Sequence, residues 1–400
     1  MTGRRPLRVC QIITKLEVGG AQATVVATAA HLAADPDVDV VTLAGIEDGS
    51  GGVLWRRARD LGLDVRPVSA LRRSVRPIAD LRAVQHLRRA LREIAPDVVH
   101  THSSKAGVLG RLAASAEGLP VMHTIHGWSS ICGDQGHATR AGVVGIERYL
   151  ARRTARLVVV TEVDRTIGLA AGIGRDDQYA LVRSPLDADD AVAARRSRDE
   201  SRAALDLGPG DFVVGSVARL AAPKDPFTLL RAFGRLSSAR PESVLVLIGG
   251  GPLEDALRVE ATAAGLADRV RFVGSHPRAA QLVGAFDVAV LASRWEGLPR
   301  TIVEAAAARI PIVANCVGGV GDIVEDGISG WCFPVGDDRA LAVALGRVVD
   351  EPAATARMVD VAEQRVQGEF GIDAVTDQLS GLWRLAAAGP LRAPEPSHAS

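Results

Sequence analysis

Short apolar segments alternate along the chain with longer segments whose apolar residues recur at helical spacing. In the first half this pattern predicts strands at residues 7–13, 38–43, 97–100, 120–124 and 157–160. It predicts helices at residues 21–34, 77–94, 143–154 and 162–171. Pro36 and Pro96 lie just beyond two of these helices, where they end the helical pattern. Strands and helices that alternate in this way are typical of βαβ units and parallel sheets.

The same pattern starts afresh in the second half of the chain. Strands are predicted at residues 212–217, 244–248, 270–273, 288–291 and 311–314. Helices are predicted at residues 226–236 and 253–264, from near Pro299, and from 337 to about 388. Residues 186–210 between the halves are polar, rich in arginine and without a strand signal, so we expect the domain boundary there.

The pattern predicts an α/β protein with two Rossmann-like parallel-sheet domains. We expect an N-terminal domain over residues 1–185, a C-terminal domain over 186–375, a last helix over 376–388 that packs back on the first domain, and a loose tail over 389–400. Ligands of such folds bind outside the carboxyl ends of the strands. We therefore expect a cleft between the two domains and functional motifs just after strands.

Composition narrows the class of protein. The chain has 400 residues, 47% hydrophobic and 24% charged, which suits a globular protein. Its net charge of zero argues against general nucleic-acid binding. Residues 1–185 carry 25 basic and 18 acidic side chains, a net +7, whereas residues 186–400 carry a net −7. Much of the excess lies in residues 56–92, which form either a solvated helix face or a surface for phosphate head groups or an anionic acceptor.

The cysteines and the N-terminal sequence indicate the cellular compartment in which the protein is expected. The four cysteines show no ligand spacing, so neither a zinc site nor a disulfide framework is expected. The N-terminal apolar stretch, residues 9–13, is too short for a signal peptide, and no run of 18 apolar residues occurs. We expect a cytoplasmic protein, with peripheral contact at the inner face of the membrane as a further option.

The most informative segment runs from Ala292 to Ala305, Ala-Ser-Arg-Trp-Glu-Gly-Leu-Pro-Arg-Thr-Ile-Val-Glu-Ala, from a strand into a helix. Free backbone N–H groups and a helix dipole at such a helix start can bind a diphosphate. Glu296 and Glu304 would face the same cleft, where each carboxylate can accept hydrogen bonds from a sugar or a ribose. The candidate donor contacts of this turn are Gly297, Leu298, Pro299, Arg300 and Thr301.

A second segment, Gly215 to Pro226, follows the first strand of the second half. Arg219 and Lys224 can converge on a diphosphate, the arginine through its planar fork and the lysine as a point charge. A solvated loop with incidental charges is the alternative. Lys224 is one of only three lysines in the chain, which favours the functional interpretation.

Three strand ends of the first half carry polar or glycine motifs. Gly19 and Gly20 follow the first strand and can let the backbone approach a ligand, although an ordinary tight turn is the alternative. His100 and His123 alternate with apolar residues and are expected to be structural. His126, followed by a glycine, is the better candidate for a residue at the reacting centre.

Taken in this order, these motifs resemble those of the family-4 retaining glycosyltransferases from about residue 7 to 380, and bacterial exopolysaccharide and cell-envelope enzymes are especially similar. The matching positions are Gly19-Gly20, Ser104-Lys105-Ala-Gly, His126-Gly127, Arg219 with Lys224, and Glu296 with Glu304. The resemblance implies a GT-B fold, a nucleotide-sugar donor held mainly by the second domain, retention of configuration, and no metal or other cofactor.

The resemblance also implies roles for the matched residues. Arg219 and Lys224 would stabilise the departing diphosphate, Glu296 would hold the sugar hydroxyls, and Glu304 the ribose. Electrostatic stabilisation of this kind needs no Mg²⁺, and no Asp-x-Asp triplet is expected to hold one. No side chain stands out as a nucleophile on the correct face of the sugar. The resemblance implies a front-face displacement.

In the first domain His126 would face the sugar, and Gly19 and Gly20 would pass close to the phosphates. The acceptor pocket of the family opens near residues 127–137, so Trp128 is a candidate acceptor contact. Lys105 of the Ser104-Lys105-Ala-Gly segment is another. The implied donor is a UDP-sugar or GDP-mannose, with the base near residues 274–277. The implied acceptor is a glycan, a polyprenyl-linked sugar or a small natural product.

Three positions depart from the family pattern. Arg183-Ser-Pro-Leu-Asp187 stands where an Asn-Gly-Val-Asp turn is usual, which leaves the hinge less certain. Asp225 stands where a glycine often follows the lysine, and Arg309 replaces a glycine before Ile310-Pro311. None of these changes removes a proposed ligand.

Other functions are compatible with parts of this pattern. A nucleotide-sugar epimerase could use the same fold, and a non-catalytic nucleotide-sugar-binding subunit could keep the same motifs. A dehydrogenase is suggested by Gly249-Gly-Gly-Pro after a strand, but a G-x-G-x-x-G motif would need glycine at Glu254.

Overall fold

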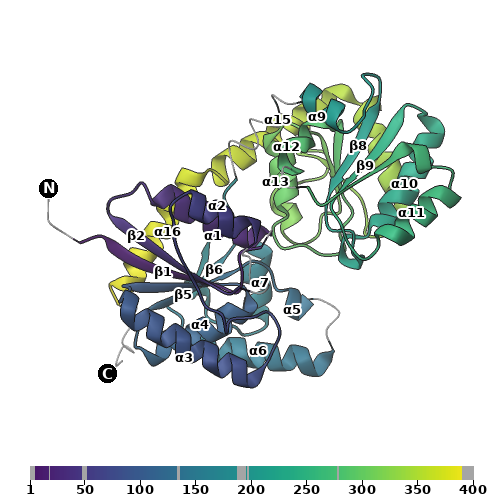
Figure 1. Cartoon of the computed structure of the whole chain (residues 1–400). Coiled ribbons are helices and arrows are strands. Elements are labelled where there is room, and N and C mark those ends of the chain that lie inside the picture. The colour runs from purple at the N-terminus through teal and green to yellow at the C-terminus, as the bar shows by residue number, and fades with distance from the viewer. Residues whose placement is uncertain are drawn as a thin grey trace, which may run out of the picture. The chain divides into compact units, whose positions relative to one another are not determined.

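The structure is a computed structural model that describes residues 5–17, 19–46, 52–132, 136–186, 195, 198–276 and 279–389. The chain divides into two compact units (Figure 1). The N-terminal unit comprises Met1–Pro185 and Ile372–Ser400, and the C-terminal unit comprises Leu186–Gly371. Each unit is a parallel α/β structure with its own cores.

Seven parallel strands form the sheet of the N-terminal unit, in the order β3-β2-β1-β4-β5-β6-β7. They are β1 (Leu7–Ile13), β2 (Val38–Ala44), β3 (Asp64–Pro67), β4 (Val98–His102), β5 (Val121–Ile125), β6 (Arg156–Val159) and β7 (Tyr179–Leu181). The sequence pattern missed β3, whose Asp-Val-Arg-Pro sequence is mostly polar and exposed, and β7, which has three residues of which only the first is buried. The strand order reverses between β1 and β4, and ligands of doubly wound folds bind beside such a reversal.

Helices cover both faces of this sheet (Figure 1). They are α1 (Gly20–Leu32), α2 (Val53–Asp60), α3 (Pro77–Ile94), α4 (Ser104–Ala116), α5 (Ser129–Cys132), α6 (His137–Ala151), α7 (Glu162–Ala170) and α16 (Ile372–Ala387). Leu87 of α3 and Ala113 of α4 belong to a core cluster with Val99, whereas Trp383 of α16 belongs to another with Val98. Because adjacent strand residues face opposite cores, the strands read as continuous apolar runs.

The C-terminal unit has six parallel strands in the order β10-β9-β8-β11-β12-β13. They are β8 (Phe212–Val217), β9 (Ser243–Ile248), β10 (Val270–Gly274), β11 (Val288–Leu291), β12 (Ile312–Ala314) and β13 (Trp331–Cys332). The helices are α9 (Arg198–Ala204), α10 (Pro226–Ala239), α11 (Glu254–Ala263), α12 (Ala279–Leu282), α13 (Arg300–Ala307), α14 (Asp338–Asp350) and α15 (Pro352–Glu369). The helical run predicted from 337 to 388 is three helices, and Pro352 at the first turn of α15 marks one break.

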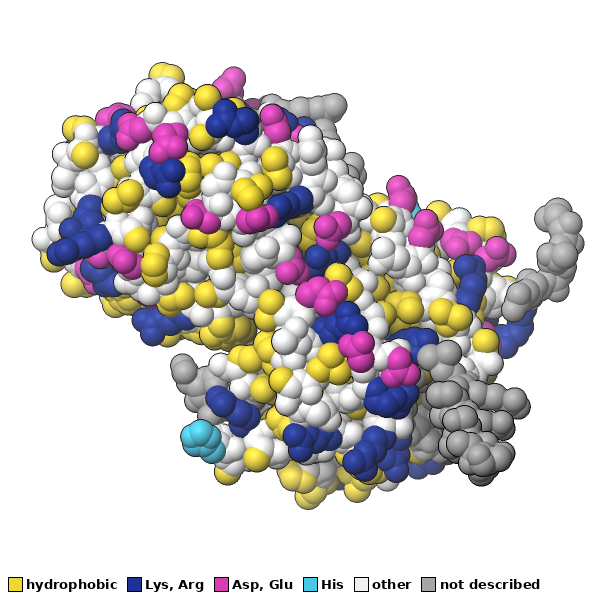
Figure 2. All heavy atoms as spheres, turned by 180° about the vertical axis from the view of Figure 1, so that it is seen from behind, with side chains coloured by type: hydrophobic (Ala, Val, Ile, Leu, Met, Phe, Trp, Pro, Cys, Tyr) yellow, Lys and Arg dark blue, Asp and Glu magenta, His cyan; other side chains and the backbone are white. Residues whose placement is uncertain are grey.

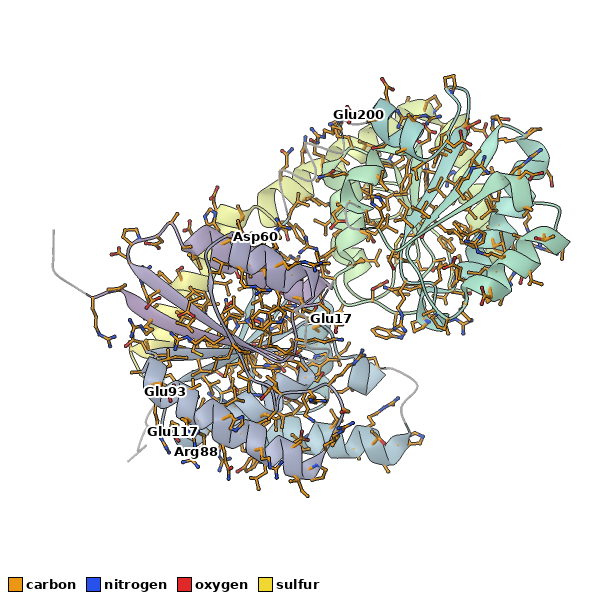
Figure 3. The ribbon with its side chains drawn as sticks, in the orientation of Figure 1. Glu17, Asp60, Arg88, Glu93, Glu117 and Glu200 are labelled. Carbon is orange, nitrogen blue, oxygen red and sulfur yellow. A yellow bond between two sulfur atoms is a disulfide. The ribbon has the colours of Figure 1, made fainter. Side chains whose placement is uncertain are left out.

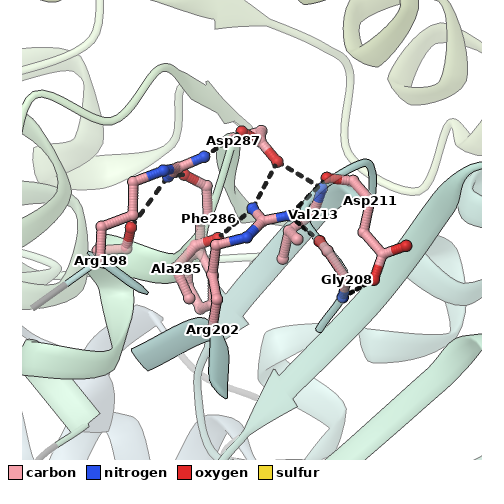
Figure 4. Close-up of polar contacts among 9 residues, drawn as sticks. Arg198, Arg202, Gly208, Asp211, Val213, Ala285, Phe286 and Asp287 are labelled. Atoms are coloured by element: carbon pink, nitrogen blue, oxygen red, sulfur yellow. Dashed lines mark hydrogen bonds and ion pairs between the residues drawn. The ribbon is translucent and has the colours of Figure 1, made fainter. Parts of the chain in front are cut away.

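The arginine-rich stretch before β8 is attached to this sheet (Figure 4). Arg198 and Arg202 of α9 reach Asp287, with Nη2–Oδ1 and Nη1–Oδ2 distances of 2.6 Å and 3.4 Å. Asp287 also accepts a hydrogen bond from the Val213 backbone N–H at 2.8 Å. The sequence pattern missed α9, which ties the described part of this stretch to the amino ends of β8 and β11. The altered hinge position Asp187 and the tail beyond residue 389 lie outside the described residues.

The expectation of no disulfide is wrong for one pair of cysteines. Cys316 and Cys332 form a disulfide with a Cα–Cα distance of 5.8 Å. β12 and β13 are paired with Ala314 opposite Cys332, so the chain leaving β12 passes the end of β13. A separation of 16 residues gave no signal in the sequence, because only strand pairing brings the two together. Cys10 is buried and free, and Cys132 is exposed and free.

Candidate functional site

Two loops meet at the carboxyl ends of the neighbouring strands β8 and β11. The first loop leads into the short 3₁₀ helix η2 (Ala222–Lys224) and then α10, and the second leads into α13. The Arg294 backbone N–H donates a hydrogen bond of 2.8 Å to the Pro223 carbonyl oxygen, which holds the loops together. The two segments that the sequence analysis singled out are therefore neighbours.

Lys224 and Glu296 form the centre of this arrangement. The Lys224 Nζ lies 2.5 Å from the Glu296 Oε1, and the Ser293 hydroxyl donates to the same oxygen at 2.5 Å. The Glu296 side chain is 8% exposed and that of Lys224 is 29% exposed. The pair leaves the second oxygen of Glu296 and part of the ammonium available at the edge of the sheet, where a sugar hydroxyl and a phosphate oxygen can bind.

The start of α13 lies just beyond Glu296. Pro299 is the N-cap residue, and no side chain caps this helix end. The first backbone N–H groups of a helix have no intrahelical acceptor, so those near Arg300 and Thr301 are suited to an anion. Arg300 Nε lies 3.6 Å from the Glu304 Oε1, one turn further along the helix. Of the other predicted donor contacts, Gly297 is half-buried and Leu298 packs against the apolar core of the unit.

A glycine pair supports the Glu296 loop and was not among the residues predicted from the sequence. Gly318 begins the 3₁₀ helix η5 (Gly318–Asp322) with a φ of 55°, in the left-handed region that favours glycine. A Cβ at Gly318 would lie 2.0 Å from the Glu296 carbonyl oxygen. The Gly319 N–H also donates to the Gly297 carbonyl oxygen at 3.0 Å. A Gly-Gly pair just after a strand was the available signal.

Substitution of Gly318 by alanine should lower donor turnover by at least about tenfold, because a displacement of the Glu296 loop by about 1 Å can cost a hundredfold in rate. The matched control is Gly321→Ala in the same 3₁₀ helix, where a Cβ would meet nothing within 4 Å. Steady-state kinetics with a nucleotide-sugar donor measure both variants. Equal rates for Gly318→Ala and the wild type would remove this loop from the site.

Arg219 is exposed on the loop after β8, and its guanidinium makes no hydrogen bond or ion pair with any residue the structure describes. Its loop is packed against the glycines after β9. A Cβ at Gly249 would lie 2.1 Å from the Ala218 carbonyl oxygen, and one at Gly251 would lie 2.2 Å from that of Leu220. The Gly-Gly-Gly-Pro segment that suggested a dinucleotide site therefore allows the backbone contact that positions Arg219.

Two of the departures from the family pattern occupy glycine-like backbone conformations. Asp225 has a φ of 42° and Arg309 a φ of 61°. Asp225 accepts a hydrogen bond from the Thr228 N–H at 3.4 Å, as the N-cap of α10, and its other oxygen lies 3.3 Å from the Arg294 Nε. Arg309 ion-pairs with Asp360 and Glu363 of α15. Side-chain contacts thus offset the cost of the left-handed backbone at both positions.

In the N-terminal unit, the carboxyl ends of β1, β4 and β5 lie side by side. Gly19 is the N-cap of α1 and Gly20 its first residue, directly after β1. The φ of 173° at Gly19 is an extended conformation that any residue adopts, so local geometry does not demand glycine there. The Thr14 and Ser103 hydroxyl oxygens lie 2.7 Å apart, and the Thr14 hydroxyl accepts from the Ala106 N–H at 3.1 Å.

His126 belongs to a group of buried histidines at these strand ends. Its Nε2 lies 3.3 Å from the Nδ1 of His102. Burial lowers the pKa of His126 to about 4 and that of His100 to about 3. The Trp383 indole N–H donates to the His100 Nδ1 at 3.1 Å, so His100 carries its proton on Nε2 and donates to the Thr124 hydroxyl at 2.7 Å. The histidines are therefore neutral at pH 7, as structural or hydrogen-bonding groups require.

A pocket of about 190 Å³ opens at this edge of the N-terminal sheet. Its walls include Ala21 next to Gly20, Ser103, His126, Trp128 and Glu147. The Trp128 side chain is buried, and its indole N–H donates to the Asp164 carbonyl oxygen at 2.7 Å.

Glu147 on this wall was missed in the sequence. Both of its oxygens accept hydrogen bonds from Arg111 Nη2, at 2.8 Å and 2.7 Å. Both side chains are nearly inaccessible to solvent.

The structure groups the predicted residues within each unit. In the C-terminal unit Lys224 and Glu296 are in contact, as are Arg300 and Glu304. In the N-terminal unit His126 and Trp128 line one pocket. The Lys105 ammonium is engaged elsewhere: it donates to the Ser74 carbonyl oxygen at 2.7 Å and lies 2.6 Å from Asp80 Oδ1.

Two further observations concern metals and membranes. Among the described residues, no three His, Cys, Asp or Glu side chains are grouped so that they could hold a metal ion. None of the described helices combines the length and the apolar composition that crossing a bilayer requires.

Solved structures share this architecture. HepE of Anabaena, in complex with UDP and glucose, matches 95% of this chain with a TM-score of 0.79 at 21% identity, over its own full length. Sucrose-phosphate synthase from Thermosynechococcus elongatus matches 96% with a TM-score of 0.81 at 22% identity, again over its full length. The two units therefore have the GT-B fold.

Sequence comparisons narrow this class. The model described as "Glycosyl transferase 4-like domain" matches residues 19–184, and the one described as "Glycosyl transferases group 1" matches residues 197–365. The glycogen synthase of Mycobacterium tuberculosis is 30% identical over 76% of this chain and 72% of its own length. An Escherichia coli UDP-Gal:alpha-D-GlcNAc-diphosphoundecaprenol alpha-1,3-galactosyltransferase is 28% identical over 79% of this chain and 82% of its own length. The chain belongs to the family-4 glycosyltransferases.

Proposed function

We propose that this glycosyltransferase is retaining and metal-independent, and that it transfers a sugar from a nucleoside-diphosphate sugar held by the C-terminal unit. The observation that carries the proposal is the contact of Lys224 with Glu296 beside the uncapped start of α13. At one sheet edge, the Lys224 cation can bind the diphosphate and the Glu296 carboxylate can bind the sugar hydroxyls. The start of α13 can stabilise the negative charge that develops as the diphosphate leaves.

Departure of the nucleoside diphosphate is the step that needs most stabilisation. Lys224 and Arg219 supply positive charge to its oxygens, and the N–H groups at the start of α13 add hydrogen bonds. Glu296, already oriented by Ser293 and Lys224, accepts hydrogen bonds from the sugar hydroxyls. Glu304 binds the ribose hydroxyls. These protein groups do what Mg²⁺ does in metal-dependent transfer, so no metal is needed.

The N-terminal unit presents His126 to the sugar. His102 Nε2 is buried without a hydrogen-bond partner among the described residues, and a buried N–H in that position would be costly. We therefore assign the His102 proton to Nδ1, from which it donates to His126 Nε2. His126 then carries its own proton on Nδ1 and stays neutral, so it can donate to a sugar hydroxyl. Gly19 and Gly20 leave room for the phosphates.

The donor is a UDP-sugar or GDP-mannose, and the acceptor is a glycan, a polyprenyl-linked sugar or a small natural product. HepE forms a complex with UDP, which supports a UDP-sugar as the donor. The Escherichia coli relative is named for a diphosphoundecaprenol substrate, which supports a polyprenyl-linked acceptor. A polyprenyl-linked acceptor brings the enzyme to the inner face of a membrane. The Trp128 wall of the N-terminal pocket is the candidate acceptor contact.

The test is donor turnover in the presence of excess EDTA, followed by NMR of the purified product. We expect an unchanged rate with EDTA and the same anomeric configuration in product and donor. Loss of activity that added Mg²⁺ restores would contradict the metal-independent mechanism, and an inverted product would contradict retention. UDP-sugars and GDP-mannose are compared first by thermal shift, because a bound donor raises stability.

The alternatives are weaker. The relatives compared above are named as transferases or synthases, so an epimerase is not favoured. A non-catalytic binding subunit would bind the donor in titration calorimetry but release no nucleotide with any acceptor.

A further inference from the structure

A short surface of the N-terminal unit exposes large apolar side chains where a solvated helix face would carry polar ones. It consists of residues 72–76 and the first turns of α3, and we call it the α3 surface. Val75 is 81% exposed, Ile78 is 73% exposed and Leu81 is 62% exposed. Three such side chains within seven residues are not the isolated exposed apolar residues that every protein carries.

The exposed side chains of α3 are distinct from those that form its core face. α3 buries Ala83, Leu87 and Leu91 against the N-terminal sheet. Ile78 and Leu81 are three residues apart and share the opposite side of the helix, on which Arg82 and Arg89 follow within three turns. The apolar residues of the α3 surface are therefore free to enter another environment without disturbing the core.

The charge around these apolar residues is of one sign. Residues 72–92 contain seven arginines and a single acidic residue, Asp80. Asp80 is already paired with Lys105 at 2.6 Å and accepts from the Arg76 N–H at 3.1 Å. The four arginines without an ion pair to any described residue are Arg72, Arg76, Arg82 and Arg89.

Towards its C-terminal end, α3 is neutralised within the protein. Arg88 and Arg92 both donate to the Glu117 carboxylate, at 2.6 Å each through Nε, and Figure 3 labels Arg88 and Glu117 side by side. The unpaired charge thus lies mainly beside Val75, Ile78 and Leu81. Figure 2, which views the molecule from behind, shows basic side chains along the lower margin of the N-terminal unit.

The composition of the α3 surface selects its partner. A second copy of the chain would bring like charges together, which opposes association. A nucleic acid would use the arginines, but the stretch contains no aromatic residue on which bases stack. An anionic lipid surface uses both features, because arginines attract phosphates and apolar side chains enter the boundary of the acyl chains.

We propose that the α3 surface docks on an anionic phospholipid bilayer, with Val75, Ile78 and Leu81 inserted into the interfacial layer and Arg72, Arg76 and Arg82 on the lipid phosphates. This contact holds the pocket edge of the N-terminal unit near the bilayer surface without a transmembrane segment. The proposal does not depend on catalysis, so lipid binding and donor turnover test different claims.

The test is flotation of the full-length chain with vesicles of phosphatidylglycerol and phosphatidylcholine in equal proportion, and with phosphatidylcholine alone. We expect binding to the anionic vesicles that weakens with salt, and little binding to the neutral ones. Two triple variants, Val75→Ser/Ile78→Ser/Leu81→Ser and Arg72→Gln/Arg76→Gln/Arg82→Gln, should each bind at least about tenfold more weakly.

The matched control is Val259→Ser/Val343→Ser in the C-terminal unit, where the two valines are 70% and 65% exposed. It should bind like the wild type. All variants should keep the thermal unfolding midpoint and the release of nucleotide from a soluble donor, which separates lipid docking from the proposed activity. Wild-type binding by both triple variants, or equal binding to neutral vesicles, would overturn the proposal. So would a wild-type dimer in light scattering that the triple variants abolish, because it would assign the surface to a second copy.

Discussion

Replacement of Lys224 by alanine should lower donor turnover by at least about tenfold, which corresponds to about 1.4 kcal/mol of lost transition-state stabilisation. The ammonium lies 2.5 Å from Glu296 and is partly open to solvent at the sheet edge. Negative charge on the leaving diphosphate grows in the transition state, so loss of the Lys224 ammonium should reduce kcat more than it raises KM. Replacement of Glu296 should have an effect of similar size through the sugar hydroxyls.

The matched control for both variants is Arg235→Ala on α10. Arg235 is an exposed cation of the same unit whose Nε lies 3.3 Å from Asp338 Oδ2. Loss of the Arg235 side chain should leave turnover unchanged, because exposed ion pairs contribute little and Arg235 lies on α10 about three helical turns beyond Lys224. Steady-state kinetics give the kcat and KM of each purified variant for comparison with the wild type. Near wild-type rates for both Lys224→Ala and Glu296→Ala would refute the proposed donor site.

Replacement of Arg111 by methionine should lower the free energy of unfolding by about 3 to 5 kcal/mol. Arg111 donates two hydrogen bonds to Glu147 and one of 2.8 Å to the Gly107 carbonyl oxygen through Nε, in the interior of the N-terminal unit. Without the guanidinium, the Glu147 carboxylate is buried with no compensating charge, and burial of an unpaired charge is costly. Chemical denaturation followed by fluorescence measures the loss.

The comparison variant is Arg92→Met, which removes an arginine from an exposed pair with Glu117. It should unfold at almost the same denaturant concentration as the wild type. The double variant Arg111→Met/Glu147→Leu should recover much of the stability lost in Arg111→Met, because two apolar side chains can replace a buried ion pair. An Arg111→Met variant as stable as the wild type would show that the Arg111–Glu147 ion pair is not buried in solution.

Much of the fold was readable in the sequence because buried parallel strands are apolar on both faces. β1, β8 and β11 have the bounds that the apolar pattern predicted. Elements with weaker signals were missed. β13 has two residues, and α4 begins at Ser104 within a stretch that drew attention for its polar residues rather than for its period.

Within the candidate site, the sequence located Lys224 and Glu296 because each follows a strong strand. Gly318 was not singled out although a Gly-Gly pair follows β12, because its role depends on a carbonyl oxygen 22 residues earlier in the chain. Glu147 was also not predicted from the sequence, because a glutamate within an amphipathic helix is expected to face solvent. Only the tertiary fold places Arg111 beside it. The roles of the predicted residues remain predictions until the variants are measured.

The sequence by itself determined the two parallel α/β halves, the family, and the loops that follow β8 and β11, since these depend on local periodicity and on residues close together in the chain. Tertiary structure alone decided which of those residues touch. It placed Trp383 against His100 across 283 residues, paired Cys316 with Cys332, and engaged Lys105 with Asp80. The physical reason is that such contacts are set by strand order and helix packing, which bring together side chains that no spacing along the chain connects.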